Sequence, residues 1–592
     1  MEVNLEYPLN VNYILRKKKL IKRELLSKKK FIKKNIAILG GSSTAEIVNI
    51  LEIFLLKNGI KPNFYQSEYN QYYEDALFKI DELTKFNPDI VYIHTTNKNI
   101  SFFPNFHDDE NDIEILLENE LVKYSSIWDS LSTLNCSIIQ NNFEYTTERP
   151  LGNLDFYDFH GRTFYIDMLN TAFSKNARIY KNLYINDINY LSSYLGLNEW
   201  FDRSLWFQAK YALSMNSIPE LAFNISKIIN SIFGISKKCL IVDLDNTCWG
   251  GVIGEDGKEG IVIGKETALA EAFSSFQLYL KDLRQRGITL AVCSKNDFKV
   301  AKEGFEHPET ILKFSDFAVF KANWLDKHLN ILDISKELNI GIESLVFIDD
   351  NPVERELVSS QLPNIAVPNI GENIETFIEY IDKNGYFESV SLINDDLNRN
   401  RYYEDNKNRT LDEASFKSYD DFLLSLNMTA SIKTFSSLYL DRITQLTNKT
   451  NQFNLTTKRY NAAEIKNISE SEDYIKIYGK LVDKYGDNGL VALIIGNIKS
   501  NKCHIDLFLM SCRILKRGME FAMFDELIKV CRKKEINEIV GYYSKTEKNS
   551  MVSDLYNQLG FIMLESNDHA SIWKLSIKKY KYKNRIIRIN NE

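Results

Sequence analysis

The 592-residue chain has few residues of the kinds that crosslink a protein or anchor it in a membrane. It contains seven cysteines and seven histidines, and neither type forms a cluster with zinc-ligand spacing. No two cysteines form a C-x-x-C pair, which favours reduced thiols in a cytoplasmic protein over a disulfide framework. No apolar run approaches the roughly 18 residues of a transmembrane helix, and the N-terminus lacks the apolar core of a signal peptide. We therefore expect no membrane insertion.

An excess of positive charge is also missing. The formal net charge is −7, so no global basic field indicates a nucleic-acid partner. The one Lys/Arg-rich run, residues 16–34, is interleaved with leucine and isoleucine, and we interpret it as a solvated amphipathic helix rather than a nucleic-acid or membrane patch. Because 592 residues exceed the size of a single core, we expect three or four domains.

The most informative segment is residues 241–251. Two apolar residues lead into Asp243-Leu-Asp245-Asn-Thr247, and two glycines follow. A buried parallel strand presents such carboxylates at the carboxyl edge of a sheet, where ligands bind. Asp243 can act as a nucleophile towards phosphorus. Asp245 lies two residues on and points to the same side, so it can donate or accept a proton. This D-x-D-x-T signature resembles that of the haloacid dehalogenase (HAD) superfamily, with Thr247 beside the phosphate.

Two further segments predict the groups that bind phosphate. Residues 287–293 read as a second buried strand, closed by Ser294 and Lys295, whose hydroxyl, ammonium and backbone N–H groups suit a phosphate oxygen. A lysine is also expected just before the helix that precedes the third strand. Lys321 and Lys327 are both candidates, and we favour Lys327 because it begins a helical pattern.

The third strand predicts a metal site. Residues 344–348 read as a strand that is apolar after Ser344, and Asp349 and Asp350 follow it. Mg²⁺ prefers hard oxygen ligands in octahedral geometry. Asp243, the backbone carbonyl of Asp245, and either Asp349 or Asp350 meet that preference, so we expect Mg²⁺ as the cofactor.

The region before this site, residues 1–235, has its own α/β pattern. A strand at residues 35–39 leads into a turn that contains Ser42, and a second strand ends shortly before Asn97. This arrangement resembles a degenerate SGNH-hydrolase-like domain. No D-x-x-H segment supplies a base, so we interpret Ser42 as a turn or helix N-cap residue rather than a catalyst.

The remaining regions complete an α/β multidomain fold. Residues 236–392 predict a βαβ unit and a HAD-like parallel sheet, and residues 393–415 read as a polar linker. Residues 416–592 contain two strands, a helix at residues 519–533, and a final helix and strand. This order resembles an α+β GNAT acyltransferase domain, in which a strand–R-x-x-G–helix junction binds the pantetheine pyrophosphate on a helix N-terminus.

Five sequence words together resemble the FkbH-like family, HAD subfamily IIIC: IVDLDNTCWGGVIGEDG (241–257), VCSKND (292–297), FIDDNPVERE (347–356), KTNQFNLTT (449–457) and SCRILKRGME (511–520). The resemblance implies a glyceryl transferase/phosphatase. Such enzymes remove the phosphates of 1,3-bisphosphoglycerate and place the glyceryl unit as a thioester on an acyl carrier protein, which feeds polyketide biosynthesis. The alternative is a HAD-type phosphatase, or a transferase that places glycerate or another acyl group on a cell-surface glycan or small molecule.

Within that resemblance, Cys512 is the best-placed acyl carrier. It lies between a strand and a helix beside Arg513 and Arg517, and cations and helix N-termini lower the pKa of a thiol. Cys248 is a rival inside the phosphate site, and His504 could be a base, although a lone histidine on a strand is more often structural.

The expected contacts to substrate or pantetheine come from two polar segments of the last region, residues 449–457 and 511–520. Residues 449–454 are too polar for a plain helix face, so they form either such contacts or an inter-domain junction. Lys516 stands where the family pattern has glycine. We expect Asp243 and Cys512 to meet one substrate at a site between domains. The expected contact residues are Asn451, Gln452, Asn454, Arg513, Arg517 and Gly518.

Overall fold

The computed structural model describes residues 5–27, 31–546 and 548–590. Its internal contacts divide the chain into two units. The first comprises Met1–Ile232 and Asn461–Glu464, and the second comprises Phe233–Tyr460 and Ile465–Glu592. No helix among the described residues is long and apolar enough to cross a membrane.

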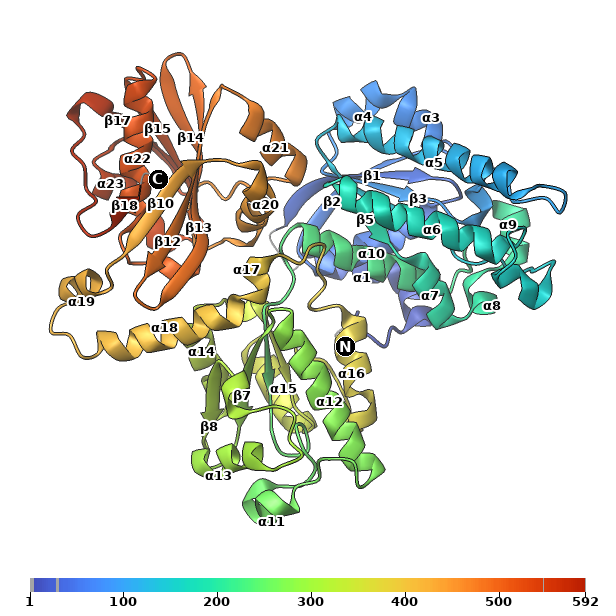
Figure 1. The fold of residues 1–592 in the computed structure, drawn as a ribbon, viewed down its shortest axis with the longest axis horizontal. Coiled ribbons are helices and arrows are strands. Elements are labelled where there is room, and N and C mark those ends of the chain that lie inside the picture. Colours follow the sequence, from blue (N-terminus) through green and yellow to red (C-terminus); the bar gives the residue numbers. More distant parts are fainter. Residues whose placement is uncertain (1–4, 28–30, 547, 591–592) are drawn as a thin grey trace. The chain divides into compact units, whose positions relative to one another are not determined.

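The first unit is built on five parallel strands in the order β2-β1-β3-β4-β5 (Figure 1). The strands are β1 (Ile32–Gly40), β2 (Ile60–Gln66), β3 (Ile90–His94), β4 (Ser137–Asn141) and β5 (Leu183–Asn186). The helices are α1 (Val11–Ser27), α2 (Ala45–Lys57), α3 (Tyr72–Leu77), α4 (Ile80–Phe86), α5 (Glu110–Ser132), α6 (Arg162–Ile179), α7 (Ile188–Leu195), α8 (Leu197–Trp200), α9 (Arg203–Ala209) and α10 (Ile218–Ile232). β3 and β4 are buried along their whole length, as strands covered on both faces are.

The two strand ends that carry Ser42 and Asn97 lie beside each other, because β1 pairs with β3. Ser42 is 1% exposed, and its hydroxyl has no hydrogen-bond partner within the described ranges. Asn97 donates to the carbonyl oxygens of Glu144 and Tyr145. Ser42 precedes Thr44, which occupies the N-cap position of α2, so Ser42 lies in the turn as expected.

The basic run at residues 16–34 is helical only in part. α1 ends at Ser27, and β1 begins at Ile32; residues 28–30 lie outside the described residues. Two lysines of α1 face α2 and form ion pairs there, Lys18 with Glu46 and Lys22 with Glu52. The run is therefore partly neutralised within its own unit.

The second unit contains two sheets. The HAD-like sheet is parallel, in the order β8-β7-β6-β9. Its strands are β6 (Cys239–Val242), β7 (Thr289–Ser294), β8 (Val319–Ala322) and β9 (Leu345–Ile348). Its helices are α11 (Ile253–Gly260), α12 (Ala268–Gln285), α13 (Phe298–Glu303), α14 (Lys327–Leu338), α15 (Pro352–Gln361) and α16 (Phe377–Asn384). The predicted βαβ unit and parallel sheet are confirmed, with α12 ending beside Gly287, whose φ of 94° favours glycine.

The C-terminal sheet is mixed, with the strand order β16-β17-β15-β14-β13-β12-β10-β18 and β11 paired to β14. Its strands are β10 (Thr429–Thr434), β11 (Phe453–Asn454), β12 (Tyr474–Asp483), β13 (Gly486–Lys499), β14 (Lys502–Met510), β15 (Glu538–Ser544), β16 (Ile562–Ser566), β17 (Ala570–Ser576) and β18 (Arg588–Asn590). Its helices are α19 (Tyr419–Ser425), α20 (Leu440–Lys449), α21 (Ala462–Glu470), α22 (Met519–Lys533) and α23 (Leu555–Leu559). The α/β multidomain fold predicted from the sequence is confirmed.

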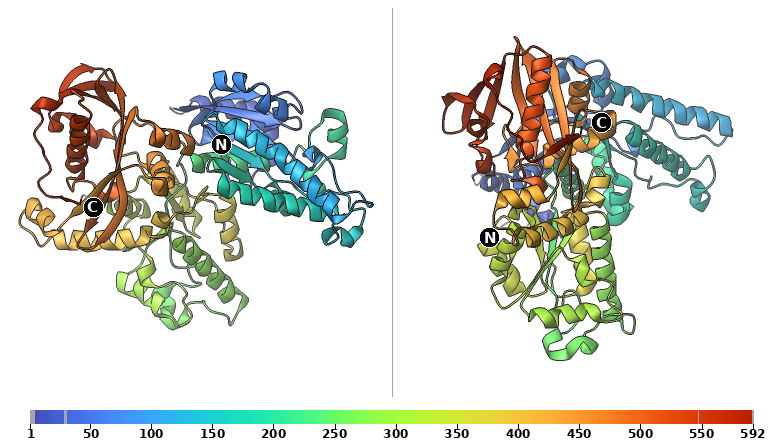
Figure 2. Two further views of the ribbon diagram at one scale, coloured as in Figure 1. Left: turned by 45° about the horizontal axis from the view of Figure 1, so that its top comes forward. Right: turned by 60° about the vertical axis from the view of Figure 1, so that its left-hand side comes forward.

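The segment at residues 393–415, expected as a polar linker, is mostly helical. It forms α17 (Asn394–Leu397) and α18 (Arg399–Glu413), and α18 runs between the HAD-like sheet and the C-terminal sheet (Figures 1 and 2). Tyr402 and Arg409, seven residues apart and so on one helix face, are both buried. The burial of this face explains why a polar segment forms a helix here.

Candidate active site

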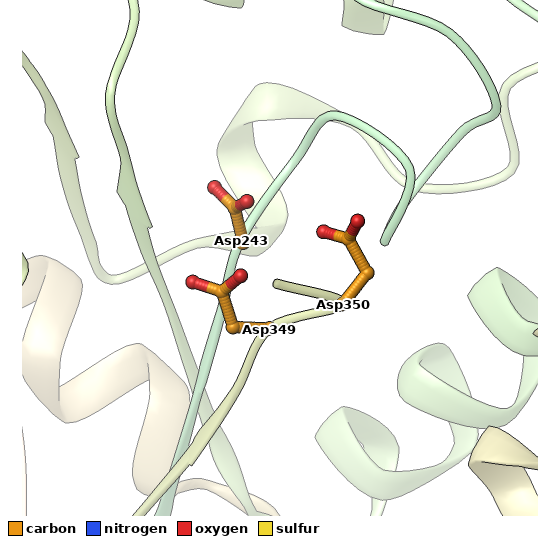
Figure 3. Close-up of side chains that lie close together, drawn as sticks. All are labelled: Asp243, Asp349 and Asp350. Atoms are coloured by element: carbon orange, nitrogen blue, oxygen red, sulfur yellow. The ribbon is translucent and has the colours of Figure 1, made fainter. Parts of the chain in front are cut away.

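Three carboxylates meet at the carboxyl edge of the HAD-like sheet (Figure 3). β6 pairs in parallel with β9, so Asp243 at the end of one strand lies beside Asp349 and Asp350 at the end of the other. Ligand oxygens of the three residues lie within 4.8 Å of one another. Both Asp349 and Asp243 are nearly inaccessible, 0% and 7% exposed.

Lys327 is the cation of this cluster. Its ammonium lies 3.0 Å from Asp243 and 2.5 Å from Asp349, and the residue is 3% exposed. Lys321 instead pairs with Glu337 at 3.0 Å. The structure therefore places Lys327, the first residue of α14, against the carboxylates.

The donor set suits a hard divalent cation. Asp243 Oδ1 is buried without a hydrogen-bond partner in the described part of the chain, and three carboxylates face one lysine. Burial and the neighbouring Asp243 raise the pKa of both Asp349 and Asp350, because like charges in a poorly solvated site oppose ionisation. A divalent cation would relieve this repulsion, so the residues present fit Mg²⁺.

Asp245 lies outside the carboxylate cluster and is held by three hydrogen bonds. Its Oδ1 accepts hydrogen bonds from Trp249 Nε1 (3.0 Å) and the Ile253 amide (3.1 Å), and its Oδ2 accepts one from Asn296 (3.0 Å). Burial raises its pKa. A carboxyl group with a raised pKa that is fixed by three donors is suited to act as a general acid and base.

The expected phosphate-binding residues surround the same edge. Ser294 is 2% exposed at the end of β7. The Thr247 hydroxyl contacts Asp350, donating to its carboxylate at 3.3 Å and lying 3.2 Å from its amide nitrogen. The Lys295 ammonium lies 2.6 Å from Glu354. Thr247 thus orients a carboxylate, and Lys295 is partly neutralised.

Two residues of the site were not singled out from the sequence. Arg355 is 7% exposed and donates to the carbonyl oxygens of Asp349 (2.7 Å) and Asp350 (2.6 Å), which fixes the loop that carries both. Asn296 holds Asp245. Arg355 lies in the segment FIDDNPVERE and Asn296 in VCSKND. The signal for both was therefore present in the non-acidic polar residues of these two segments.

Cys512 lies apart from the carboxylate cluster, in a cavity of about 320 Å³ within the second unit. Of the seven cysteines, all of them in the described part of the chain, only Cys512 is partly exposed. Lys238, Asn339 and Glu343 line the cavity from the HAD-like side, Arg399 and Tyr403 from α18, and Lys449, Asn451 and Gln452 from the C-terminal side. Asn339 Nδ2 donates to the Cys512 carbonyl oxygen at 3.1 Å.

The expectation that Asp243 and Cys512 share one substrate at one site is wrong for this arrangement. Lys238 precedes β6 and Asp243 follows it, so the cavity and the carboxylates lie at opposite edges of the HAD-like sheet. At ~3.3 Å per strand residue, these two backbone positions are about 16 Å apart. A three-carbon substrate cannot reach both sites at once.

The expected pantetheine contacts divide into two groups. Asn451 and Gln452 line the cavity. Asn454 is 1% exposed and accepts a hydrogen bond from the Thr457 amide at 2.9 Å within its own turn. Lys238 Nζ donates to the carbonyl oxygen of Lys449 at 3.3 Å, so the 449–454 segment lines the cavity and also joins the two domains.

The arginines after β14 are engaged within the protein. Arg513 stacks on Tyr402, 4.0 Å from the ring centroid, and lies 3.6 Å from Asp395. Arg517 is 6% exposed and pairs with Asp483 at 3.1 Å. Gly518 caps α22 with a φ of 81°, and Lys516 also takes a positive φ, 64°, which favours the glycine expected there.

The opening between β14 and β15 is filled by the chain itself. These strands pair in parallel only over their first residues, and beyond that point β11 pairs with β14. The Leu455 amide donates to the Phe508 carbonyl (3.1 Å), and the Ser544 amide donates to the Leu455 carbonyl (2.8 Å). A ligand running between the two strands would have to displace these hydrogen bonds.

Cys248 and His504, the two weaker catalytic candidates from the sequence, have surroundings that differ from those of Cys512. Cys248 is buried in the core beside Asp243, and burial raises its pKa well above that of an exposed thiol, so it stays protonated. His504 Nδ1 lies 2.8 Å from the Tyr542 hydroxyl near the start of β14, whereas Cys512 follows the end of that strand.

Comparison with known proteins agrees with this geometry. The model of the FkbH N-terminal domain matches residues 35–230. The crystal structure of the N-terminal part of BF1531 from Bacteroides fragilis, which contains a phosphatase domain complexed with Mg, is 31% identical with a TM-score of 0.59; the match covers 63% of this chain and 99% of that one. No curated protein matches the chain.

Two acetyltransferase structures match at a lower level. The ribosomal-protein-S18-alanine N-acetyltransferase from Escherichia coli is 14% identical and PaiA N-acetyltransferase from Thermoplasma acidophilum, in complex with coenzyme A, is 16% identical; each covers 25% of this chain, with 94% and 99% of its own length matched and a TM-score of 0.21. On its sequence words, its carboxylate cluster and its similarity to the BF1531 fragment, the chain belongs to the FkbH-like family of HAD-type enzymes.

Proposed function

We propose that the chain is a Mg²⁺-dependent phosphatase and glyceryl transferase. It would take the acyl group of 1,3-bisphosphoglycerate onto Cys512 and pass a glyceryl thioester to the pantetheine thiol of an acyl carrier protein. The observation that carries this proposal is the pairing, in one unit, of a buried carboxylate–lysine site with a separate cavity that contains the one partly exposed thiol among the described residues.

The carboxylate site supports phosphate-ester hydrolysis. The Asp243 carboxylate attacks phosphorus, and Asp245 gives a proton to the leaving alcohol. Asp245 then takes a proton from the water that hydrolyses the aspartyl phosphate. Lys327 reduces the repulsion between the incoming phosphate and the carboxylates. Mg²⁺ bound by Asp243, Asp349 and Asp350 would supply charge neutralisation for the transferred phosphoryl group.

The cavity supports acyl transfer. A thiolate is the reactive form of cysteine and a good nucleophile towards an acyl phosphate, an activated acyl donor. Lys238 and Arg399 line the same cavity as Cys512 and attract an anionic donor to it. The thioester formed on Cys512 can exchange with a second thiol, which is the chemistry of loading a carrier protein.

The test is intact-protein mass spectrometry with Mg²⁺, 1,3-bisphosphoglycerate made in situ, and a holo acyl carrier protein. The proposal predicts an acyl adduct on the enzyme that hydroxylamine removes, that is absent from Cys512→Ala, and that moves to the carrier. Phosphate release without an adduct on any thiol would contradict it and would leave a HAD-type phosphatase with another acceptor, such as a glycan.

A further inference from the structure

The first unit carries an apolar groove on its surface. The groove lies between α5 and α6, which pack side by side (Figure 1) against one face of the sheet, and its volume is about 780 Å³. Every residue that lines the groove belongs to the first unit. The apolar lining residues are Leu117 and Leu121 from α5, Phe164 and Met168 from α6, and Phe156 and Tyr157 from the loop before α6.

Side chains in and beside this groove are more exposed than apolar groups of their size usually are. Phe156 and Tyr157 are 59% and 69% exposed. Ile115 and Val122 of α5, seven residues apart and so on one side of that helix, are 49% and 55% exposed. An exposed apolar surface that is rimmed by charged residues is typical of a protein–protein contact.

The charged residues that rim the groove are separated by sign. α5 carries glutamates towards its N-terminus, and α6 carries basic residues towards its C-terminus. The five residues are exposed, and none of them forms an ion pair within the ranges that the structure describes. They are Glu110, Glu114 and Glu118 on α5 and Lys175 and Arg178 on α6. This surface is complementary to a partner that presents the same two rows in reverse order.

The two rows cannot pair with each other inside one chain. α5 and α6 run in the same direction, because each crosses from one strand of the parallel sheet to the next. Glu114 lies about five residues before the middle of the α5 stretch that lines the groove, and Lys175 lies about five residues after the middle of the α6 stretch. The two residues are therefore separated by about 15 Å along the helices.

A second copy of the chain supplies the reversed order. A two-fold axis through the middle of the groove, perpendicular to the layer of two helices, turns the second copy end for end and lays its α5 against this α6. Glu114 of the second copy then lies opposite Lys175, and Glu110 of the second copy lies opposite Arg178. Because the axis repeats each contact, a dimer gains every such pair twice.

We propose that the groove between α5 and α6 is the contact surface of a two-fold symmetric homodimer. The exposed apolar side chains of the two copies pack together, and the glutamates of each α5 pair with the basic residues of the other copy's α6. α6 has 18 residues and is about 27 Å long. A face made of two such helices and the loop before α6 is on the order of the 800 Å² that each partner of a standard interface buries.

Sedimentation velocity of the full chain tests the dimer. The chain of 68.8 kDa should give a species of twice that mass, whose share rises with protein concentration. Sodium chloride should weaken the dimer, because salt screens exposed ion pairs. A chain that stays at 68.8 kDa up to about 100 µM, well above the Kd of ordinary interfaces, would overturn the proposal.

Two exposed aromatic residues locate the contact. Phe156→Asp and Tyr157→Asp should each raise the dimer Kd about 10-fold or more, because each dimer would bury the new carboxylate twice in an apolar contact. Both side chains are exposed in a single copy, so the fold should tolerate the changes. The matched control is Phe78→Asp, at an aromatic residue outside the groove that is 77% exposed. An equal Kd in all three variants would place the contact elsewhere and overturn the assignment.

Charge exchange tests the two-fold arrangement itself. Glu114→Lys and Lys175→Glu should each raise the dimer Kd about 10-fold or more, since each change replaces two attractive pairs with two repulsive ones. The double variant, and an equimolar mixture of the two single variants, should each return the Kd to within about threefold of the wild type. The control is Lys19→Glu, at an exposed lysine of α1, which should leave the Kd unchanged.

Failure of this rescue would overturn the pairing of α5 with α6 of the other copy. A monomeric chain that binds an acyl carrier protein, and loses that binding in Tyr157→Asp, would assign the groove to that protein and overturn the homodimer. Because these experiments measure assembly alone, failure of the dimer leaves the proposed function intact, and failure of the proposed function leaves the dimer intact.

Discussion

Lys327→Met is the perturbation whose size follows most directly from the structure. Lys327 is 3% exposed and contacts Asp243 and Asp349 at 3.0 and 2.5 Å. Removing one partner from a buried ion pair leaves an uncompensated charge and costs about 3–5 kcal/mol. The matched control is Lys321→Met, whose partly exposed pair with Glu337 contributes about 0–1 kcal/mol.

The loss should depend on pH and on metal. Burial and Asp243 raise the pKa of Asp349, and loss of Lys327 removes a group that opposes this shift. A carboxyl group whose pKa is higher in the folded than in the unfolded state stabilises the fold at low pH. This stabilisation is lost as the pH rises through the folded-state pKa. The variant should therefore be less destabilised at pH 5 than at pH 8. Mg²⁺ at 100 times its Kd for the variant should restore about 2.7 kcal/mol.

The assay is denaturant unfolding of both variants and the wild type, followed through tryptophan fluorescence, with and without Mg²⁺. Lys327→Met should lower the free energy of unfolding far more than Lys321→Met. If the two variants lose the same amount, or if neither Mg²⁺ nor pH changes the loss in Lys327→Met, then Lys327 does not neutralise a metal-binding carboxylate cluster.

Four further predictions concern the two sites and the buried Arg517–Asp483 pair. Asp243→Asn should lower phosphatase kcat by about 10³-fold or more without changing the melting temperature markedly; retained activity would exclude Asp243 as the nucleophile. Arg355→Met should weaken Mg²⁺ binding about 10–100-fold in calorimetry, since it fixes the loop of two metal ligands. Arg517→Met should destabilise the protein by about 1–3 kcal/mol in denaturant unfolding, because the buried Asp483 carboxylate loses one arginine partner and keeps the other, Arg409. Sulfate, whose charge is constant at these pH values, should protect Cys512 from alkylation better at pH 6 than at pH 8.5, because Lys449 loses its charge as pH rises through about 7; a flat profile would show that Lys449 does not contribute.

The carboxylate site could be predicted from the sequence because its parts are strand ends. Parallel strands end at one edge, so Asp243 and Asp349 had to lie close together once β6 and β9 were recognised. The choice between Lys321 and Lys327 depends on the loop that ends β8 and begins α14. Only the three-dimensional course of that loop shows which lysine reaches the carboxylates.

The cavity around Cys512 could not be predicted in the same way. Lys238, Arg399 and Arg442 are far apart in the sequence, and each has an ordinary local context. Their convergence depends on how α18 and α20 pack against the HAD-like domain. The same holds for Arg517, which the sequence offered as a pantetheine contact and the fold pairs with Asp483 on β12.

Helix α18 shows why composition alone gave a wrong prediction of a linker at residues 393–415. Residues 393–415 are rich in asparagine, aspartate and arginine, which is typical of a linker. Tyr402 and Arg409 nevertheless share a buried face, and Arg409 donates two hydrogen bonds to the Asp483 carboxylate, at 2.8 and 3.0 Å. An arginine that is buried by pairing with a carboxylate adds nothing to a hydrophobic pattern. The hydrophobic pattern of residues 393–415 therefore underestimates how much of the segment is helical.

The most direct test of the account compares two single-site variants, Asp243→Asn and Cys512→Ala, with the wild type. Asp243→Asn should lose phosphate-ester hydrolysis but keep acyl capture on Cys512, and Cys512→Ala should lose acyl capture but keep phosphate-ester hydrolysis. Mass spectrometry of the carrier protein after incubation with Mg²⁺ and 1,3-bisphosphoglycerate should show the glyceryl thioester with the wild type and with neither variant. Loss of both activities in either variant, or a glyceryl-loaded carrier formed by either variant, would contradict two separate sites.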